Sequence, residues 1–211
     1  AIRRQRQMCI RDSMNIVYIL AYLVIWPVFR LLKPTKAIQK QNLPKGGALY
    51  CANHTRMSDP LFVAYAMGWP NQIHVMAKEE VMHWPVLGWI LKHGGIFGVK
   101  RGQSDVAAIK TAMKYLKAGE KLLMFPEGTR HQDGEFGDAK TGAAMLAVRT
   151  GVPIVPIYMP AEKKWFRLNP VVFGQPYYPK VAGRKGTAEE YRAIAEDLMR
   201  RIEALKPLAG R

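Results

Sequence analysis

The sequence predicts an α/β fold: a mixed, largely parallel sheet flanked by helices, with an N-terminal apolar membrane-anchoring helix. Short apolar runs typical of buried strands alternate with segments of helical periodicity between residues 48 and 205. Hydrophobic residues make up 49% of the 211 positions, and no shift in composition marks a second core. We therefore expect three parts, which are a non-native leader at residues 1–13, the anchoring helix at residues 14–32 and one folded domain at residues 33–211.

The leader, AIRRQRQMCIRDS, resembles translated adapter sequence, and Met14 would be a natural start. Without it the chain holds 28 basic and 15 acidic residues, a formal charge of +13, compared with +16 for the whole sequence. Such a charge favours anionic partners, which include nucleic acid, an acidic carrier protein, a phosphorylated substrate and an anionic membrane. Cys51 is then the one remaining cysteine, which predicts a reducing compartment.

The next segment, MNIVYILAYLVIWPVFRLL, is apolar except for Asn15, Pro27 and Arg30. A helix over residues 16–29 would be about 21 Å long at roughly 1.5 Å per residue, which is shorter than a hydrocarbon core of roughly 30 Å. We therefore expect an uncleaved interfacial anchor, followed on the cytoplasmic side by the basic residues at positions 30, 33, 36 and 40. A helix buried against the domain is the alternative.

The remaining elements follow a polar linker that ends in LPKGG. Local signals mark the helix ends: an acidic residue before Pro60 and then Gly68, Ser104 as a cap and Gly119 as a stop, and a capping box from Thr187 to Glu190. Apolar runs between these signals predict strands over residues 48–53, 73–78, 95–100, 121–125, 152–159 and 170–174. Helices are predicted over residues 58–68, 84–95, 104–119, 142–151 and from residue 187 onward.

His54 and Asp59 lie in the connection between the first of these strands and the following helix. One interpretation makes Asp59 an ordinary acidic N-cap before Pro60. The other folds the loop back, so that the carboxylate accepts a hydrogen bond from one imidazole nitrogen and leaves the other free as a base. This connection is also where open α/β sheets place their ligands. The pair alone leaves catalysis and a structural pairing both open.

A base at His54 lacks an obvious nucleophile within the protein. Cys51 precedes it by three residues in a strand, so its side chain should point to the opposite face. Ser58 lies in the capping turn, where we expect its hydroxyl to have a local role. The proton that His54 removes should therefore come from a substrate hydroxyl or from water.

Two further basic segments each follow a strand. In FPEGTR, residues 125–130, a tight turn brings the Thr129 hydroxyl, backbone N–H groups and the Arg130 guanidinium to one place, which suits a phosphate. In VKRG, residues 99–102, Lys100 and Arg101 end a strand. Either segment could instead be a solvated basic turn.

The blocks NHTRMSD, GIFGVKRG, FPEGTR and VPIVPI occur in this order. From about Leu43 to Val172 the chain resembles the glycerolipid acyltransferase family, specifically its bacterial 1-acyl-glycerol-3-phosphate acyltransferases. The resemblance implies that His54 is the general base of an HX4D motif, that Asp59 orients it and that Lys78 stabilises the oxyanion. It implies that the glycerol-phosphate end of the acceptor is held by Arg101, Glu127, Gly128, Thr129 and Arg130, and that Asn53 and Lys140 can support these groups.

The implied reaction moves a fatty acyl group from a thioester of acyl carrier protein or coenzyme A to the sn-2 hydroxyl of lysophosphatidic acid, making phosphatidic acid. It needs no metal or other cofactor. We expect the partners to be lysophosphatidic acid, the thioester donor and a membrane lipid surface, with the protein peripheral or monotopic on the cytoplasmic face of the cell membrane. We expect no nucleic acid partner, because the basic residues are scattered and form no recognised binding motif.

Other functions remain open. The acceptor could be glycerol 3-phosphate or another lysolipid, and a protein of a different class would be a non-catalytic membrane phospholipid-binding module. A zinc site is not expected, because the other histidines lack ligand spacing to a second His or Cys. These histidines, which we set aside as unrelated to the site, are His74, His83, His93 and His131.

Overall fold

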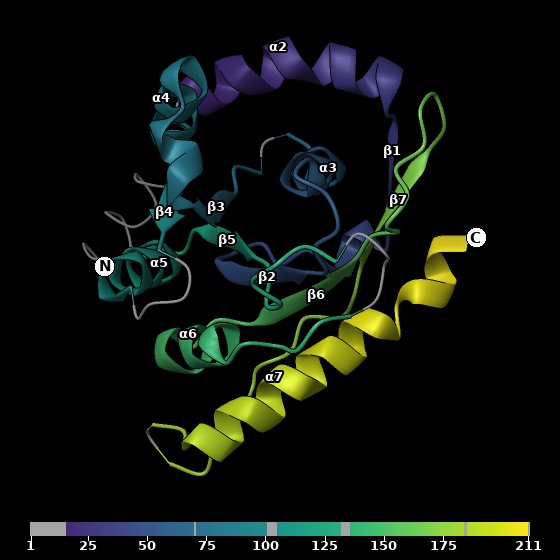
Figure 1. The fold of residues 1–211 in the computed structure, drawn as a ribbon. Helices are drawn as coiled ribbons and strands as arrows, with labels where there is room; N and C mark the ends of the chain where they lie inside the picture. The colour runs from purple at the N-terminus through teal and green to yellow at the C-terminus, as the bar shows by residue number, and fades with distance from the viewer. Residues whose placement is uncertain (1–15, 70, 101–104, 132–135, 184, 211) are drawn as a thin grey trace, which may run out of the picture.

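The structure, a computed structural model, describes residues 16–69, 71–100, 105–131, 136–183 and 185–210. Its centre is a seven-stranded sheet with the order β1-β7-β6-β2-β5-β3-β4 (Figure 1). Neighbouring strands are parallel except β6 and β7, which are antiparallel, so the predicted mixed, largely parallel sheet is confirmed. The strands are β1 (Thr35–Ile38), β2 (Ala48–Ala52), β3 (His74–Lys78), β4 (Ile96–Val99), β5 (Lys121–Met124), β6 (Ile154–Tyr158) and β7 (Asn169–Phe173).

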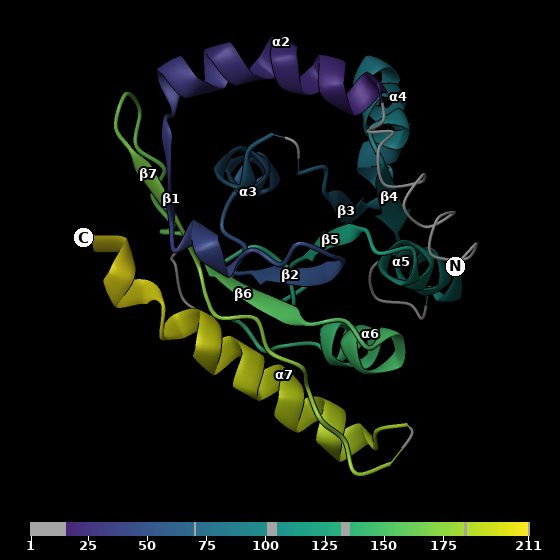
Figure 2. The ribbon, with the colours of Figure 1, turned by 180° about the vertical axis from the view of Figure 1, so that it is seen from behind.

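Helices pack on both faces of this sheet (Figures 1 and 2). On one face, Phe62 and Val63 of α3 join Tyr50 and Val155 in a core of buried apolar side chains. The core of the other face is formed with α5, α6 and α7. The helices are α2 (Ile16–Leu32), α3 (Asp59–Met67), α4 (Pro85–His93), α5 (Val106–Lys117), α6 (Gly142–Thr150) and α7 (Ala188–Glu203). This layering follows from apolar strands that must be covered on both sides.

The central strand β2 is buried along its whole length, and its side chains alternate between the two cores. Tyr50 and Ala52 face α3, whereas Leu49 and Cys51 face the opposite side, as the pleat of a strand requires. Cys51 is completely buried, and this burial raises the pKa of its thiol. The expectation that Cys51 is no nucleophile for the His54 site is therefore supported by both its direction and its environment.

Helix α2 lies across the outside of α3 (Figures 1 and 2). The ring of Phe29 contacts Phe62 and Tyr65 at centroid distances of 4.8 and 4.9 Å, while Tyr22 contacts Tyr65 at 5.0 Å. No residue of α2 is buried, although most of the helix is apolar. In the part of the chain that the structure describes, none of the helices is both long enough and apolar enough to cross a membrane. Helix α2 therefore packs on the domain through part of its surface and leaves the rest exposed, and its role as a membrane anchor stays a prediction.

Two element boundaries differ from the prediction. Residues 35–38, which we expected within a polar linker, form the edge strand β1 and pair with residues 169–172 of β7. This strand is only four residues long and exposes Lys36, so it carries too weak an apolar pattern to be recognised. Helix α5 is capped by Asp105, whose carboxylate accepts from the Ala108 N–H at 2.9 Å. The predicted cap, Ser104, lies outside the described residues.

Candidate active site

The turn between β2 and α3 is organised around the carboxylate of Asp59, which is completely buried. Its Oδ2 atom accepts hydrogen bonds from the backbone N–H groups of Thr55 and Arg56 at 2.7 and 2.8 Å. The N-cap of α3 is Ser58, whose side chain makes no capping hydrogen bond, so the local role that we expected for its hydroxyl is wrong. Asp59 is the first residue of the helix and folds back over the preceding turn. The interpretation of Asp59 as a simple N-cap is therefore wrong.

The same carboxylate oxygen holds the imidazole of His54. Nδ1 of His54 lies 3.1 Å from Oδ2 of Asp59, and the imidazole stacks on Phe125 with centroids 3.9 Å apart. Because a carboxylate only accepts hydrogen bonds, Nδ1 carries the proton and Nε2 is left as the basic atom. Burial alone would raise the pKa of Asp59, but the hydrogen bond from His54, the charge of Lys163 and the backbone donors outweigh it and lower that pKa. Asp59 is thus held as a carboxylate.

Asn53 fixes the end of β2 directly before the histidine. Its Nδ2 donates to the Met159 carbonyl at 2.8 Å, and its Oδ1 accepts from the Met159 N–H at 2.9 Å. These two hydrogen bonds join β2 to the residue that follows β6. The backbone that carries His54 is therefore tied to a neighbouring strand of the sheet on one side.

Glu127 ties the same backbone on the other side. Its Oε1 accepts from the His54 N–H at 3.0 Å, and its Oε2 accepts from the Gly137 N–H at 3.2 Å. His131 lies beside this carboxylate, with Nε2 3.6 Å from Oε2 of Glu127 and 3.2 Å from the Thr129 hydroxyl. Burial raises the pKa of Glu127, although the N–H groups of Gly137 and His54 and the nearby imidazoles act to lower it. Both carboxylate oxygens of Glu127 accept hydrogen bonds from backbone N–H groups of the protein, so this residue holds the backbone of the site in place.

The turn at residues 125–130 presents its polar groups to solvent next to His54. Gly128 closes the turn with its N–H on the Phe125 carbonyl at 3.1 Å and adopts a φ of 71°, which favours glycine. Thr129 and Arg130 are exposed, so an anion from solvent can reach both side chains. The His131 N–H donates to the His54 carbonyl at 2.9 Å. The structure therefore brings the predicted base and the predicted anion-binding turn together, although 73 residues separate His54 from Glu127.

Comparison with known proteins identifies the family. A sequence profile described as Acyltransferase matches residues 35–160, more than half of the chain. The chain belongs to the acyltransferase family. It is 30% identical over 177 residues to a 1-acyl-sn-glycerol-3-phosphate acyltransferase of Bacillus subtilis, a match that covers 81% of this chain and 87% of that protein. It is also 35% identical over 121 residues to a chloroplastic 1-acyl-sn-glycerol-3-phosphate acyltransferase of Brassica napus, covering 56% of this chain.

The extent of these matches differs between relatives of the acyltransferase family. The chain spans 34%, 33% and 59% of the length of three plant relatives, from Brassica napus, Arabidopsis thaliana and Limnanthes douglasii. Its fold is similar to the crystal structure of the 1-acyl-sn-glycerophosphate acyltransferase PlsC from Thermotoga maritima, with a TM-score of 0.64 and 22% identity. That likeness covers 99% of this chain and 83% of the other, and it establishes the acyltransferase fold for nearly the whole sequence.

Three further residues were predicted from the sequence to belong to the site, namely Lys78, Lys140 and Arg101. Lys78 ends β3, and its half-exposed ammonium lies 2.9 Å from the carboxylate of Glu80. Lys140, in contrast, lies against the turn, because a Cβ atom built on Gly128 would be 3.1 Å from its Nζ. Arg101 lies outside the described residues. The roles that the acyltransferase resemblance gives to Lys78 and Arg101 thus stay predictions.

Three side chains of this site were not predicted from the sequence. Phe125 begins the FPEGTR block but was given no role there, and Lys163 belongs to no motif. Their contacts with His54 and Asp59 depend on how the loops fold. His131 was set aside, yet it contacts Glu127 and Thr129. Its place directly after the FPEGTR block was the available signal. His74, by contrast, lies at the amino-terminal end of β3, where its imidazole contacts the Gly95 carbonyl and Glu120.

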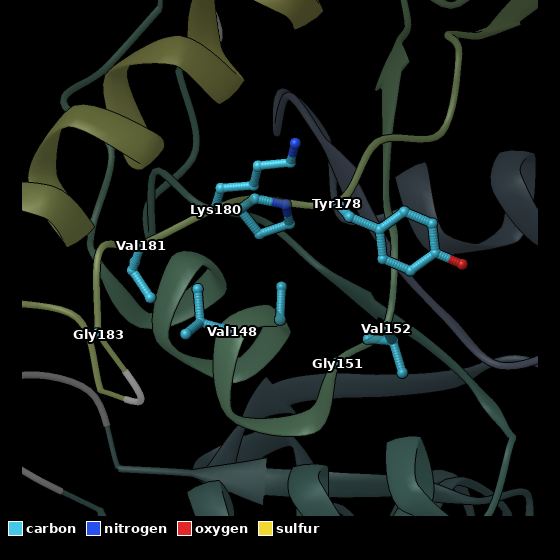
Figure 3. A pocket seen from close by; sticks show the side chains of 9 residues that line it. Val148, Gly151, Val152, Tyr178, Lys180, Val181 and Gly183 are labelled. Atoms are coloured by element: carbon cyan, nitrogen blue, oxygen red, sulfur yellow. The ribbon is translucent and has the colours of Figure 1, made fainter.

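A separate hollow of about 330 Å³ lies between the end of α6 and residues 178–183 (Figure 3). Val148, Gly151 and Val152 line one side, and Tyr178 and Lys180 line the other. Gly151 and Val152 precede β6, whereas His54 follows β2, which is parallel to β6. The hollow therefore lies at the opposite edge of the sheet and is not the site of the His54 chemistry.

Proposed function

We propose that this protein transfers a fatty acyl group from an acyl thioester to the sn-2 hydroxyl of 1-acyl-glycerol 3-phosphate, forming phosphatidic acid. The observation that carries the proposal is the pair of hydrogen bonds from the His54 N–H to Glu127 and from the His131 N–H to the His54 carbonyl. They join the backbone of His54, the proposed general base, to a basic, exposed turn. The two relatives described above from Bacillus subtilis and Brassica napus are named 1-acyl-sn-glycerol-3-phosphate acyltransferases, which supports this choice of acceptor.

The proposed mechanism is a direct transfer. Nε2 of His54 removes the hydroxyl proton as the acceptor oxygen attacks the thioester carbonyl. The C–S bond then breaks, and the leaving thiolate takes the proton back from His54. Asp59 holds the imidazole and offsets its transient positive charge. Since the buried Cys51 is no candidate nucleophile, the acyl group passes from donor to acceptor within one ternary complex.

The anion-binding turn selects the acceptor. The Arg130 guanidinium and the Thr129 hydroxyl bind the phosphate of the lysolipid, with Arg101 and Lys140 as further cations. The negative charge that develops on the carbonyl oxygen requires a donor, for which Lys78 or a backbone N–H is the candidate. Acyl carrier protein and coenzyme A are both suitable carriers of the thioester, because both are anionic and the chain has a formal charge of +13 even without residues 1–13.

The exposed apolar surface on α2 supports the proposal that the protein binds to a membrane. Leu20, Val24 and Leu31 of α2 have exposed fractions of 55%, 71% and 71%. Neighbouring segments extend this surface at both ends of α2. Helix α4 lies beside its first residues (Figures 1 and 2), and the Phe166 N–H donates to the Leu32 carbonyl at its end. Exposed Trp89 lies in α4, and exposed Trp165 and Phe166 lie beside the end of α2. An apolar face of this size with aromatic residues suits the membrane interface. We place the protein on the cytoplasmic face of the cell membrane.

The test uses the full chain in detergent with lysophosphatidic acid and either acyl carrier protein or coenzyme A thioesters. His54→Ala should lower kcat by about 10² to 10⁴-fold, the usual contribution of a general base. Arg130→Ala should raise KM for lysophosphatidic acid by about tenfold or more, since a hydrogen bond to a charged group is lost. His83→Ala, an exposed histidine away from the site, is the matched control.

Parallel reactions with glycerol 3-phosphate and other lysolipids define the acceptor. Equal product from the wild type and all three variants would overturn the mechanism. Binding to phospholipid vesicles without turnover on any acceptor would identify a non-catalytic lipid-binding module instead.

A further inference from the structure

Lys163 is a buried lysine that contacts the turn carrying His54 and Asp59. It belongs to the connection between β6 and β7, and only 4% of its side chain is exposed. Its Nζ atom lies 3.3 Å from Oδ1 of Asp59 and donates to the Thr55 hydroxyl at 3.3 Å and to the Pro160 carbonyl. A lysine ammonium has three N–H donors, and here three acceptors face it. Such a set fits a protonated amine with no N–H left for a substrate.

The two oxygens of Asp59 have separate partners. Oδ2 receives the imidazole of His54 and the N–H groups of the turn. Oδ1 is buried, and its partner among the described residues is the ammonium of Lys163, 3.3 Å away. A buried carboxylate is costly unless its charge is compensated, and a neutral imidazole does not compensate it. Lys163 supplies the missing positive charge.

We propose that Lys163 is a positioning residue of the dyad: its charge holds Asp59 ionised and keeps His54 neutral, and so sets the proton affinity of the catalytic base. This proposal rests on the proposed function, in which His54 acts as the base. Burial lowers the pKa of Lys163, while the charge of Asp59 and its hydrogen bond act to raise it. The lysine and the carboxylate therefore depend on each other for their charged states.

The direction of the effect follows from the charges around the pair. His54 lies beside the carboxylate of Asp59 and near the carboxyl of Glu127, and negative charge on either group favours the protonated imidazolium. The positive charge of Lys163 disfavours the imidazolium. The positive charges of its neighbours Arg56 and Lys33 act in the same direction. Removing the ammonium leaves a buried negative charge that draws a proton to the His54–Asp59 pair. The pair should then stay protonated to a higher pH.

The experiment compares the full chain with Lys163→Met, Lys163→Gln and Lys163→Arg over a range of pH. We expect the acidic limb of kcat/KM to move up by about one pH unit or more in both neutral variants, so that activity falls further at about pH 7 than at about pH 9. Lys163→Arg should keep the limb close to that of the wild type. Lys164→Met removes a neighbouring exposed lysine and should leave the profile unchanged.

A second readout does not depend on turnover. The imidazole of His54 is titrated by NMR in the substrate-free protein, with its signal assigned through His54→Gln. An upward shift of its midpoint in Lys163→Met and Lys163→Gln supports the proposal even if the acceptor has been assigned wrongly. A uniform loss of activity with no shift, or restoration by Gln as complete as by Arg, would show that Lys163 contributes hydrogen bonds only. If neither neutral variant folds, the charge serves the fold and the proposal fails.

Discussion

The backbone N–H of His54 donates to the side chain of Glu127 at 3.0 Å, although the two residues are 73 positions apart. The hydrogen bond explains why a histidine after β2 and a Pro-Glu-Gly turn after β5 belong to one site. Strands β2 and β5 are parallel neighbours, so their carboxyl ends meet at the same edge of the sheet. Glu127 then fixes the distance between the base and the exposed turn that we assign to the phosphate.

The buried carboxyl of Glu127 should make stability depend on pH. Burial raises its pKa in the folded protein above the value of about 4.3 for an exposed glutamate. Its contribution to stability is therefore complete below that pH and is lost as pH rises through the folded pKa. We expect the free energy of unfolding of the wild type, relative to that of Glu127→Gln, to fall as the pH rises above about 4. Denaturant unfolding of both proteins measures this, and a difference that does not vary with pH would contradict it.

The stacked ring of Phe125 should limit the motion of the catalytic imidazole. Stacked aromatic pairs contribute about 0.5 to 1.5 kcal/mol beyond their buried area, so Phe125→Leu should lower kcat by about two- to tenfold and leave KM for the acceptor unchanged. Phe97→Leu removes a ring that contacts Tyr115 in the other core and provides the control. Steady-state kinetics decide the matter, and equal kcat values for the two variants would argue against a role for the stack.

The exposed apolar residues of α2 should contribute to binding of lipid. Replacing Leu20, Val24 and Leu31 together by serine should weaken binding to anionic phospholipid vesicles by about tenfold or more, because each side chain loses apolar area that the membrane would cover. Val106→Ser, at a position 59% exposed on α5, should have no effect. Vesicle sedimentation provides the measurement. Unchanged binding of the triple variant would exclude α2 as the membrane contact.

The capping box of α7 should affect stability without affecting chemistry. The Thr187 hydroxyl accepts from the Glu190 N–H, and the Glu190 side chain accepts from the Thr187 N–H. Thr187→Ala should therefore lower the free energy of unfolding by about 1 kcal/mol. Because α7 packs on the face opposite α3, kcat should not change. A loss of activity that exceeds the loss of folded protein would refute this separation.

The sequence predicted most of the fold because its local patterns agree with the topology. The apolar run of β2, the Gly68 end of α3 and the capping box of α7 all lie where the sequence placed them. The edge strand β1 was missed because an edge strand with one neighbour needs little apolar character. The position of a short exposed strand depends on its hydrogen bonds to the neighbouring strand, which cannot be recognised in a single sequence.

The motif residues of the candidate site were predicted from the sequence, whereas the side chains that hold them in place were not. His54, Asp59 and the turn after β5 carry recognisable spacing, and the structure brings them together. The ammonium of Lys163 reaches Asp59 from a loop more than a hundred residues away, and sequence alone gives a lysine in such a loop a solvent-exposed position by default. A buried partner of this kind becomes visible only when the loops are placed in space.

The loop that carries Lys163 also contacts the end of helix α2. The Phe166 N–H donates to the Leu32 carbonyl at 2.7 Å, and the Lys33 ammonium lies 4.3 Å from the centre of the Trp165 ring. A protein shortened to begin after residue 32 would lose one attachment of that loop together with the apolar helix. Low turnover of such a truncation would then report a disturbed active site, and it would say little about how much the enzyme needs its membrane.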